Sequence, residues 1–188
     1  MGYILTTFGR IWEASIAAVG SHVTLGLGGI LFLGFPTAFW CGAYGYAIAA
    51  KAGTGLGFSF GIGLLLSLVV GVIFAFFYSR VSNDSFAVIT LASILALESL
   101  IRSLDFLTGG VLGISGVPRP AFAATLFALI GIQAVVAFLA LGIESLVARS
   151  SFGRSLRALN ENRTALIALW TPADRVGQAA ILAACLLA

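Results

Sequence analysis

The side chain in this sequence that is best suited to take part in chemistry belongs to an acidic residue inside an apolar stretch. Glu98 lies about two turns inside the apolar segment 86–104, where an ionised carboxylate is costly and normally faces protein or a water-filled cavity. Arg102 follows four residues later, on the same helical face, and is within reach of an ion pair. Two interpretations stay open: a purely structural Glu98–Arg102 pair, and a place on the path of a transported substrate.

The single histidine, His22, has no carboxylate or second histidine at helical spacing. We expect it to hydrogen-bond between helices, and the alternative is a role as a ligand or proton relay. Glu144 lies near the end of another apolar segment, where we expect it to pair with Arg149 or to be solvated. Cys41 and Cys185 both fall in apolar stretches, where cysteine usually packs as a small residue, so we expect neither a disulfide nor a metal pair.

Nothing in the sequence predicts a nucleotide site or covalent catalysis. There is no glycine-rich loop ending in Gly-Lys-Ser/Thr and no GxGxxG after a strand. The net charge of +3 arises from basic residues concentrated in one connection between apolar segments, whereas nucleic-acid binding needs a basic face in water. We therefore predict no catalytic residue, no metal site, no cofactor and no nucleic-acid partner.

The elements that must position these side chains follow from the composition. Of the 188 residues, 60% are hydrophobic and 9% are charged, which excludes an ordinary water-soluble enzyme. No charge occurs between Glu13 and Lys51, or between Lys51 and Arg80. Each gap exceeds the length of about 20 apolar residues that crosses a bilayer as a helix. The sequence therefore predicts an all-α fold, a polytopic transmembrane helical bundle in a lipid bilayer.

We expect about five full spans and a partial sixth. The full spans are predicted at residues 14–33, 36–50, 56–78, 86–104 and 121–148. The second is short and glycine-rich, so a half-crossing or re-entrant segment stays open. An apolar stretch at residues 176–188 is too short to cross as a helix and is expected to be an incomplete span.

The remaining segments divide the chain further. Residues 1–13 form an N-terminal segment that does not resemble a cleaved export signal, so we expect it to be retained. Residues 14–148 form the transmembrane core. Residues 149–175 hold half of the ten basic residues, which predicts a cytoplasmic loop, with residues 105–120 on the opposite side of the membrane.

Within this loop, apolar and polar residues alternate at helical spacing. Leu156 and Leu159 are interleaved with Arg157 and Glu161, which predicts a short amphipathic helix, or a helix pair broken at residues 160–162. Such an element suits the membrane surface, or a groove on a partner protein.

Glycine is unusually frequent, with 23 residues. The spacings of two groups let helix backbones approach closely: Gly42 with Gly45, and the set Gly53, Gly57 and Gly61. Close helix packing is one interpretation. The other is broken helices that line a polar path through the membrane.

Four segments, in this order along the chain, resemble the membrane permeases of branched-chain amino acid ABC importers. The most specific is TGGVLGISGVPRP at residues 108–120, which is similar to that family's TGG-x-x-GISGIPRP. The others are residues 25–44, FAVITLA at 86–92 and SFGRSLRALNEN at 151–162. The resemblance implies a multi-pass permease of the bacterial inner membrane that imports branched-chain amino acids or a related small polar solute.

The same resemblance implies three protein partners: an ABC ATPase subunit, a second permease subunit and an extracytoplasmic solute-binding protein. ATP hydrolysis is expected on the ATPase subunit, so the chain itself is expected not to be an enzyme. Segment 151–162 matches the family's loop that contacts the ATPase. This match implies an ATPase-coupling role for Gly153, Arg154, Arg157, Ala158, Glu161 and Asn162.

Candidates for the substrate path are Glu98, Gly34 and the external-loop glycines Gly109, Gly110 and Gly113. Gly34 is what remains of the family's Gln-x-Ser-x-Gly-His motif, which reads ILFLGF at residues 30–35 and lacks the polar side chains. Family members continue for several more helices. A second hypothesis is therefore a truncated or degenerate permease that acts as an accessory membrane subunit without transport of its own.

Overall fold

The computed structural model describes residues 2–118, 125–168 and 170–187, and the regular elements within these ranges are all helical. In chain order they are α1 (Gly2–Ser21), the π-helix η1 (His22–Leu27), α2 (Phe35–Lys51), α3 (Leu56–Tyr78), α4 (Asn83–Ser103), α5 (Asp105–Thr108), the 3-10 helix η2 (Gly110–Leu112), α6 (Leu126–Arg149), α7 (Ser151–Glu161), α8 (Arg163–Ala168) and α9 (Ala173–Leu187). The predicted all-α class is confirmed for the described ranges.

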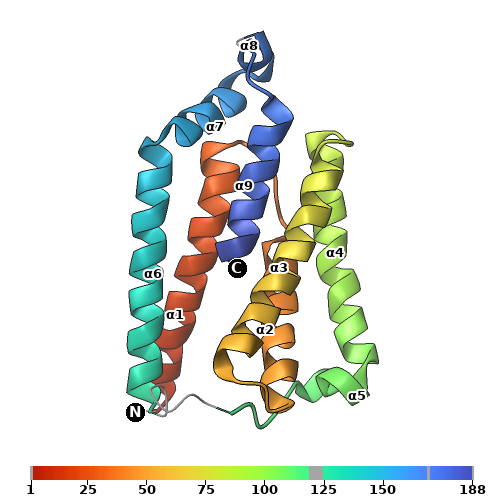
Figure 1. Cartoon of the computed structure of the whole chain (residues 1–188), viewed down its shortest axis with the longest axis vertical. Helices are drawn as coiled ribbons and strands as arrows, with labels where there is room; N and C mark the ends of the chain where they lie inside the picture. Colours follow the sequence, from red (N-terminus) through yellow and green to blue (C-terminus); the bar gives the residue numbers. More distant parts are fainter. Residues whose placement is uncertain (1, 119–124, 169, 188) are drawn as a thin grey trace.

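The long helices run up and down beside one another (Figure 1). α1 and α6 lie side by side at one flank, α2 packs against α3, and α4 lies at the other flank. α7 and α8 cover one end of the bundle, which we call the α7 end. α9 descends from the α7 end and stops near the middle of the bundle, between α1 and α3.

Three of the described helices are long and apolar enough to cross a membrane: α3, α4 and α6. α3 begins and ends at the predicted residues, Leu56 and Tyr78, and α4 and α2 differ from the prediction by at most three residues at either end. α6 is described from Leu126, so the first residues of the span predicted at 121–148 lie outside the described ranges.

The limits predicted for the first span, 14–33, are wrong. α1 already begins at Gly2 and passes through Arg10 and Glu13, and regular structure ends at Leu27. We call residues 22–34, which comprise η1 and the irregular chain after it, the broken segment. Glycine inside a helix costs about 1 kcal/mol relative to alanine, and Gly29 adopts a φ of +62°, which is favourable only for glycine. The helix therefore ends well before Leu33.

The hydrophobic core lies at the α7 end. It combines apolar side chains of the broken segment, the start of α2, the second half of α3, the start of α4, and α7, α8 and α9. Phe32 is central, because its ring centroid lies 5.4 Å from that of Phe74 and 6.0 Å from that of Phe86. Tyr78 meets Phe86 edge to face at 5.4 Å. These pairs join the broken segment to α3 and α4.

Glycines do bring two helices together, but only some of the predicted ones take part. A Cβ at Gly63 of α3 would lie 2.8 Å from the carbonyl oxygen of Gly42 in α2, so Gly63 has no room for a side chain, and a Cβ at Gly42 would lie 3.3 Å from the carbonyl oxygen of Gly63. Gly45 of α2 packs against Leu66 in the same contact. Gly57 and Gly61 face open space instead, so close packing is the wrong interpretation for them.

Candidate functional site

α7 is an amphipathic helix with defined ends, as the sequence predicts. The side chain of Ser150 accepts a hydrogen bond from the backbone N–H of Gly153 at 3.3 Å and caps its start. The helix ends before Asn162, and α8 begins one residue later, which confirms the predicted helix pair. Leu156 is fully buried and Leu159 nearly so, whereas Glu161 is exposed. One face of α7 therefore belongs to the core and the other faces outward.

Gly153 allows the sharp turn between α6 and α7. A Cβ at this position would lie 2.3 Å from the carbonyl oxygen of Val147 and 2.7 Å from that of Ala148. Both atoms are backbone atoms at the end of α6 and cannot move independently of that helix. Any residue other than glycine would push α7 away from α6.

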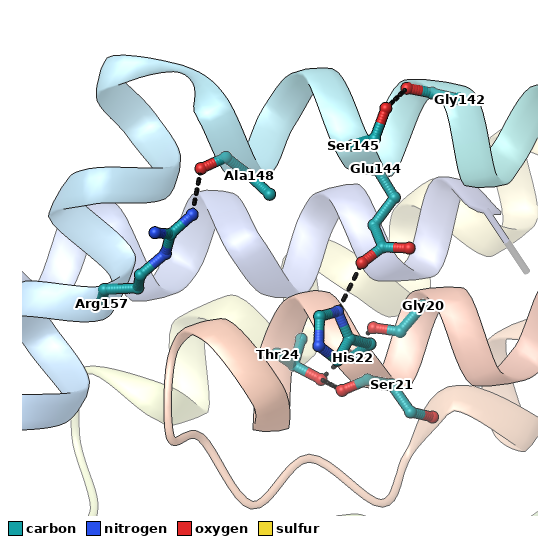
Figure 2. A network of polar contacts seen from close by, with 9 residues as sticks. All are labelled: Gly20, Ser21, His22, Thr24, Gly142, Glu144, Ser145, Ala148 and Arg157. Carbon is teal, nitrogen blue, oxygen red and sulfur yellow. Dashed lines mark hydrogen bonds and ion pairs between the residues drawn. The ribbon is translucent and has the colours of Figure 1, made fainter.

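The two arginines predicted to contact the ATPase also bind the end of α6. Arg154 donates hydrogen bonds to the carbonyl oxygen of Arg149 at 3.2 Å and to the Ser151 hydroxyl at 2.8 Å. Arg157 donates to the carbonyl oxygen of Ala148 (Figure 2). Carbonyl groups at a helix C-terminus lack partners within the helix and carry partial negative charge, so both guanidinium groups stabilise this end.

α7 also contacts the broken segment. A Cβ at Gly29 would lie 2.2 Å from the Oδ1 atom of Asn160, and one at Gly28 would lie 3.3 Å from a methyl group of Leu156. On its other side, the carbonyl oxygen of Gly29 accepts a hydrogen bond from Asn83 at the start of α4. The irregular chain is therefore held between α7 and α4.

A second connection joins the broken segment to α6. His22 forms a hydrogen bond with Glu144, whose side chain is only 15% exposed (Figure 2). The expected hydrogen bond between helical elements is confirmed for His22. The pairing expected for Glu144 is wrong, because Arg149 lies five residues on and about 140° around the helix. The ring of His22 also covers Gly26, where a Cβ would lie 2.4 Å from it.

Glu98 and Arg102 form the predicted pair, with 2.6 Å between the carboxylate oxygen and the guanidinium nitrogen. Both side chains are substantially exposed on α4. Gly34 caps the start of α2 and is buried between Phe32 and Phe74, which leaves no space for a Cβ.

The loop glycines lie at the end of the bundle opposite α7 (Figure 1). Gly109, Gly110 and Gly113 have φ values of +73°, +57° and +69°, which explains the need for glycine in these turns. Thr108 closes the first turn by donating a hydrogen bond to the carbonyl oxygen of Ile101 at 2.6 Å. The last two residues of the matched motif, 119 and 120, lie outside the described ranges.

A cavity of about 860 Å³ lies between α1, α2, α3, α6 and the end of α9. Its walls are mainly apolar, with the aromatic rings of Phe35, Phe39 and Phe60 among them. The polar side chains on it are Arg10, Glu13, Tyr46 and Ser67. None of the predicted substrate-path residues is among the described residues that line it.

Sequence reasoning therefore missed Arg10 and Glu13. The available signal was a pair of opposite charges three residues apart just before an apolar stretch, which we assigned to the N-terminal segment 1–13. Glu13 accepts a hydrogen bond from Gln133 of α6 at 3.0 Å. Within the described part of the chain, the Arg10 side chain has no hydrogen-bond or ion-pair partner.

Comparison with known proteins agrees with the segments matched above. The family model described as "branched-chain amino acid transport system / permease component" matches residues 3–188, nearly the whole chain. Searches of curated proteins and of solved structures gave no significant match. Because the family match spans both the helical bundle and α7, the chain belongs to the family of permease components of branched-chain amino acid transport systems.

Proposed function

We propose that this chain is the transmembrane permease subunit of an ABC importer for branched-chain amino acids or a related small polar solute, driven by a partner ATPase. The family membership supports the transport role. The observation that carries the proposal further is the attachment of α7 to two different parts of the bundle, the C-terminus of α6 and the broken segment. When a partner protein displaces a helix that is fixed in this way, the helix moves the C-terminus of α6 and the broken segment with it.

In this proposal the α7 end faces the cytoplasm of a bacterial cell and the chain crosses the inner membrane several times. The crossings are α1, the broken segment together with α2, α3, α4 and α6, with α9 as a partial sixth. The broken segment suits a crossing because part of its irregular backbone, at Gly28 and Gly29, packs against α7 and α4. The concentration of basic residues in 149–175 supports the orientation.

The six coupling residues divide into two groups under this proposal. Gly153, Arg154, Arg157 and Ala158 hold α7 to the bundle or pack beneath it, while Glu161 and Asn162 are exposed at its end. We propose that the ATPase binds this exposed end and that ATP-driven movement of the ATPase tilts α7. Tilting displaces the broken segment and α6 together, because both are attached to α7.

The remaining partners complete the importer. A second permease subunit packs beside this one in the bilayer, and an extracytoplasmic solute-binding protein delivers the solute at the opposite end of the bundle. The chain moves its solute without covalent chemistry, and the ATPase subunit hydrolyses the ATP.

The test is uptake of radiolabelled leucine into vesicles that contain the chain, its ATPase and its solute-binding protein. We expect uptake that requires ATP. Replacing Glu161 with lysine should lower uptake about tenfold, because a reversed charge at a docking surface opposes association. The matched control is Asp84→Lys, a charge reversal at another exposed position near the same end. Equal uptake in the two variants would remove the coupling assignment, and no ATP-dependent uptake in the wild type would remove the transport function.

A further inference from the structure

Two polar side chains of α4 bind the backbone of the broken segment. Asn83 donates a hydrogen bond to the carbonyl oxygen of Gly29 at 3.2 Å. Thr90, two turns further along α4, is fully buried and accepts a hydrogen bond from the N–H of Leu33 at 3.3 Å. Because the second half of the broken segment is not helical, its backbone groups need partners from other elements when they lie inside a membrane. α4 supplies two of these partners.

The same face of α4 continues to the start of α2. The hydroxyl oxygen of Ser93 lies 3.0 Å from that of Thr37, in the first turn of α2. Phe86 is fully buried, and its ring stacks on that of Phe32 in the broken segment. The four contacting residues of α4 fall within about 80° around the helix axis and span about 15 Å along it. One face of α4 is therefore attached to residues 29–37 over much of its length.

The far end of α4 holds the loop of residues 105–116, which we call the glycine loop. The Thr108 hydroxyl donates a hydrogen bond to the carbonyl oxygen of Ile101 in the last turns of α4, and accepts one from the N–H of Gly110 at 3.2 Å. In Figure 1, α4 runs from the α7 end, where it meets the broken segment, to α5 and the glycine loop at the opposite end of the bundle. α4 therefore joins the two ends.

We infer that α4 and residues 29–37 move as one body and carry the movement of α7 to the glycine loop. Asn83, Thr90 and Ser93 are the positioning residues of this body. Coupling between distant sites is carried by hydrogen bonds, packed side chains and rigid helices, and α4 combines all three. α7 packs against the broken segment, so a displacement of α7 shifts that segment first, then α4, and then the glycine loop. This inference rests on the proposed ATP-driven movement of α7 and adds its route to the far side of the membrane.

The test follows the glycine loop in the complex of this chain with its ATPase and second permease subunit in lipid nanodiscs. Cys41 and Cys185 are replaced by alanine, and Leu112, which is 95% exposed, is replaced by cysteine. The measurement is the rate at which a polar thiol reagent modifies the new cysteine, with and without ATP and vanadate. We expect ATP to change this rate about fivefold.

Two variants weaken the attachment of α4, and a matched control leaves it intact. Ser93→Ala removes the hydroxyl that meets α2, and Thr90→Val removes the hydroxyl that accepts from the broken segment while the side-chain shape is kept. Each should reduce the ATP-dependent change in rate to less than about twofold. Ser99→Ala makes the same chemical change as Ser93→Ala on the opposite, exposed face of α4, and should keep the full response. A full response in both Ser93→Ala and Thr90→Val would overturn the inference, and would indicate a route through α3, which meets α4 at Tyr78.

A covalent link tests the same body by rescue, without the cysteine at position 112. In the variant that combines Thr37→Cys with Ser93→Cys, dibromobimane joins the two thiols in place of the contact between the two hydroxyls. The unlinked variant should show lower ATP-driven leucine uptake than its parent, and the link should restore it. Thr37→Cys alone, treated with the same reagent, is the control. A fall in uptake on linking would overturn the inference, because it would show that α4 and α2 must move apart.

Failure of this route and failure of the transport function give different results. If uptake requires ATP but the glycine loop does not respond to ATP, the transport proposal stands and this inference falls. If the loop responds to ATP through Thr90 and Ser93 but no solute is taken up, the inference stands and the transport proposal falls.

Discussion

The two ends of the bundle use their side chains in opposite ways. At the α7 end, apolar residues of the broken segment and of α2, α3, α4, α7, α8 and α9 meet in one core, and the polar side chains of Arg154, Arg157 and His22 bind other parts of the same chain. At the other end, Arg10 has no described partner, and aromatic residues such as Phe60 and Phe106 are exposed. The comparison teaches that internal contacts are concentrated at the end where we propose that the ATPase binds, while apolar side chains are left exposed at the end where we propose that the solute-binding protein delivers the solute.

The largest effect should come from the α7 core. Leu156→Ala removes a fully buried side chain between α7 and the broken segment, and should lower the free energy of unfolding by about 2–5 kcal/mol. Thermal unfolding in detergent, together with the rate of proteolysis within 149–175, measures this loss. Leu146→Ala is the control, because that leucine of α6 is 70% exposed. Equal destabilisation by the two variants would mean that the α7 end is no more tightly packed than the rest of the surface.

Glycine-to-alanine replacements in α6 and α7 should distinguish a position where a Cβ clashes from a position where a Cβ has room. Gly153→Ala places a Cβ against two backbone carbonyl oxygens of α6, and should destabilise the chain by about 1–3 kcal/mol. Gly142→Ala, near the middle of the C-terminal half of α6, meets nothing within 4 Å and should stabilise the helix by up to about 1 kcal/mol. The measurement is the midpoint of thermal unfolding. A shift of the same sign in both variants would contradict the close approach of α6 and α7.

Sequence reasoning succeeded where a feature depends only on residues close together in the chain. The limits of α3 follow from a long charge-free stretch between Gly55 and Ser79, and the break between α7 and α8 follows from polar residues at 160–162. Neither feature depends on distant parts of the chain. Local composition and periodicity were therefore sufficient to predict them.

It failed where the structure depends on contacts between distant segments. Glycine accounts for the break after Leu27, but the place of the following chain depends on Asn160 of α7 and Asn83 of α4, both remote in sequence. The partner of Glu144 lies 122 positions away, at His22. The cavity has walls from five helices, so the sequence alone did not show that Arg10 and Glu13 of α1 line it.

The smallest effect should come from the hydrogen bond between His22 of the broken segment and Glu144 of α6. His22 is more than half exposed, so solvent weakens the pair, and Glu144→Gln should cost about 1 kcal/mol in the free energy of unfolding. The amide still accepts a hydrogen bond from the imidazole, so the variant removes charge and preserves shape. A double-mutant cycle with His22→Gln, measured by thermal unfolding, isolates the coupling energy of the pair. The His22–Glu144 contact attaches the broken segment to α6 independently of α7. Its loss should therefore also lower the rate of ATP-driven uptake, even though the free energy of unfolding changes only slightly. Unchanged uptake with a measurable coupling energy would show that α7 alone links these two elements during transport.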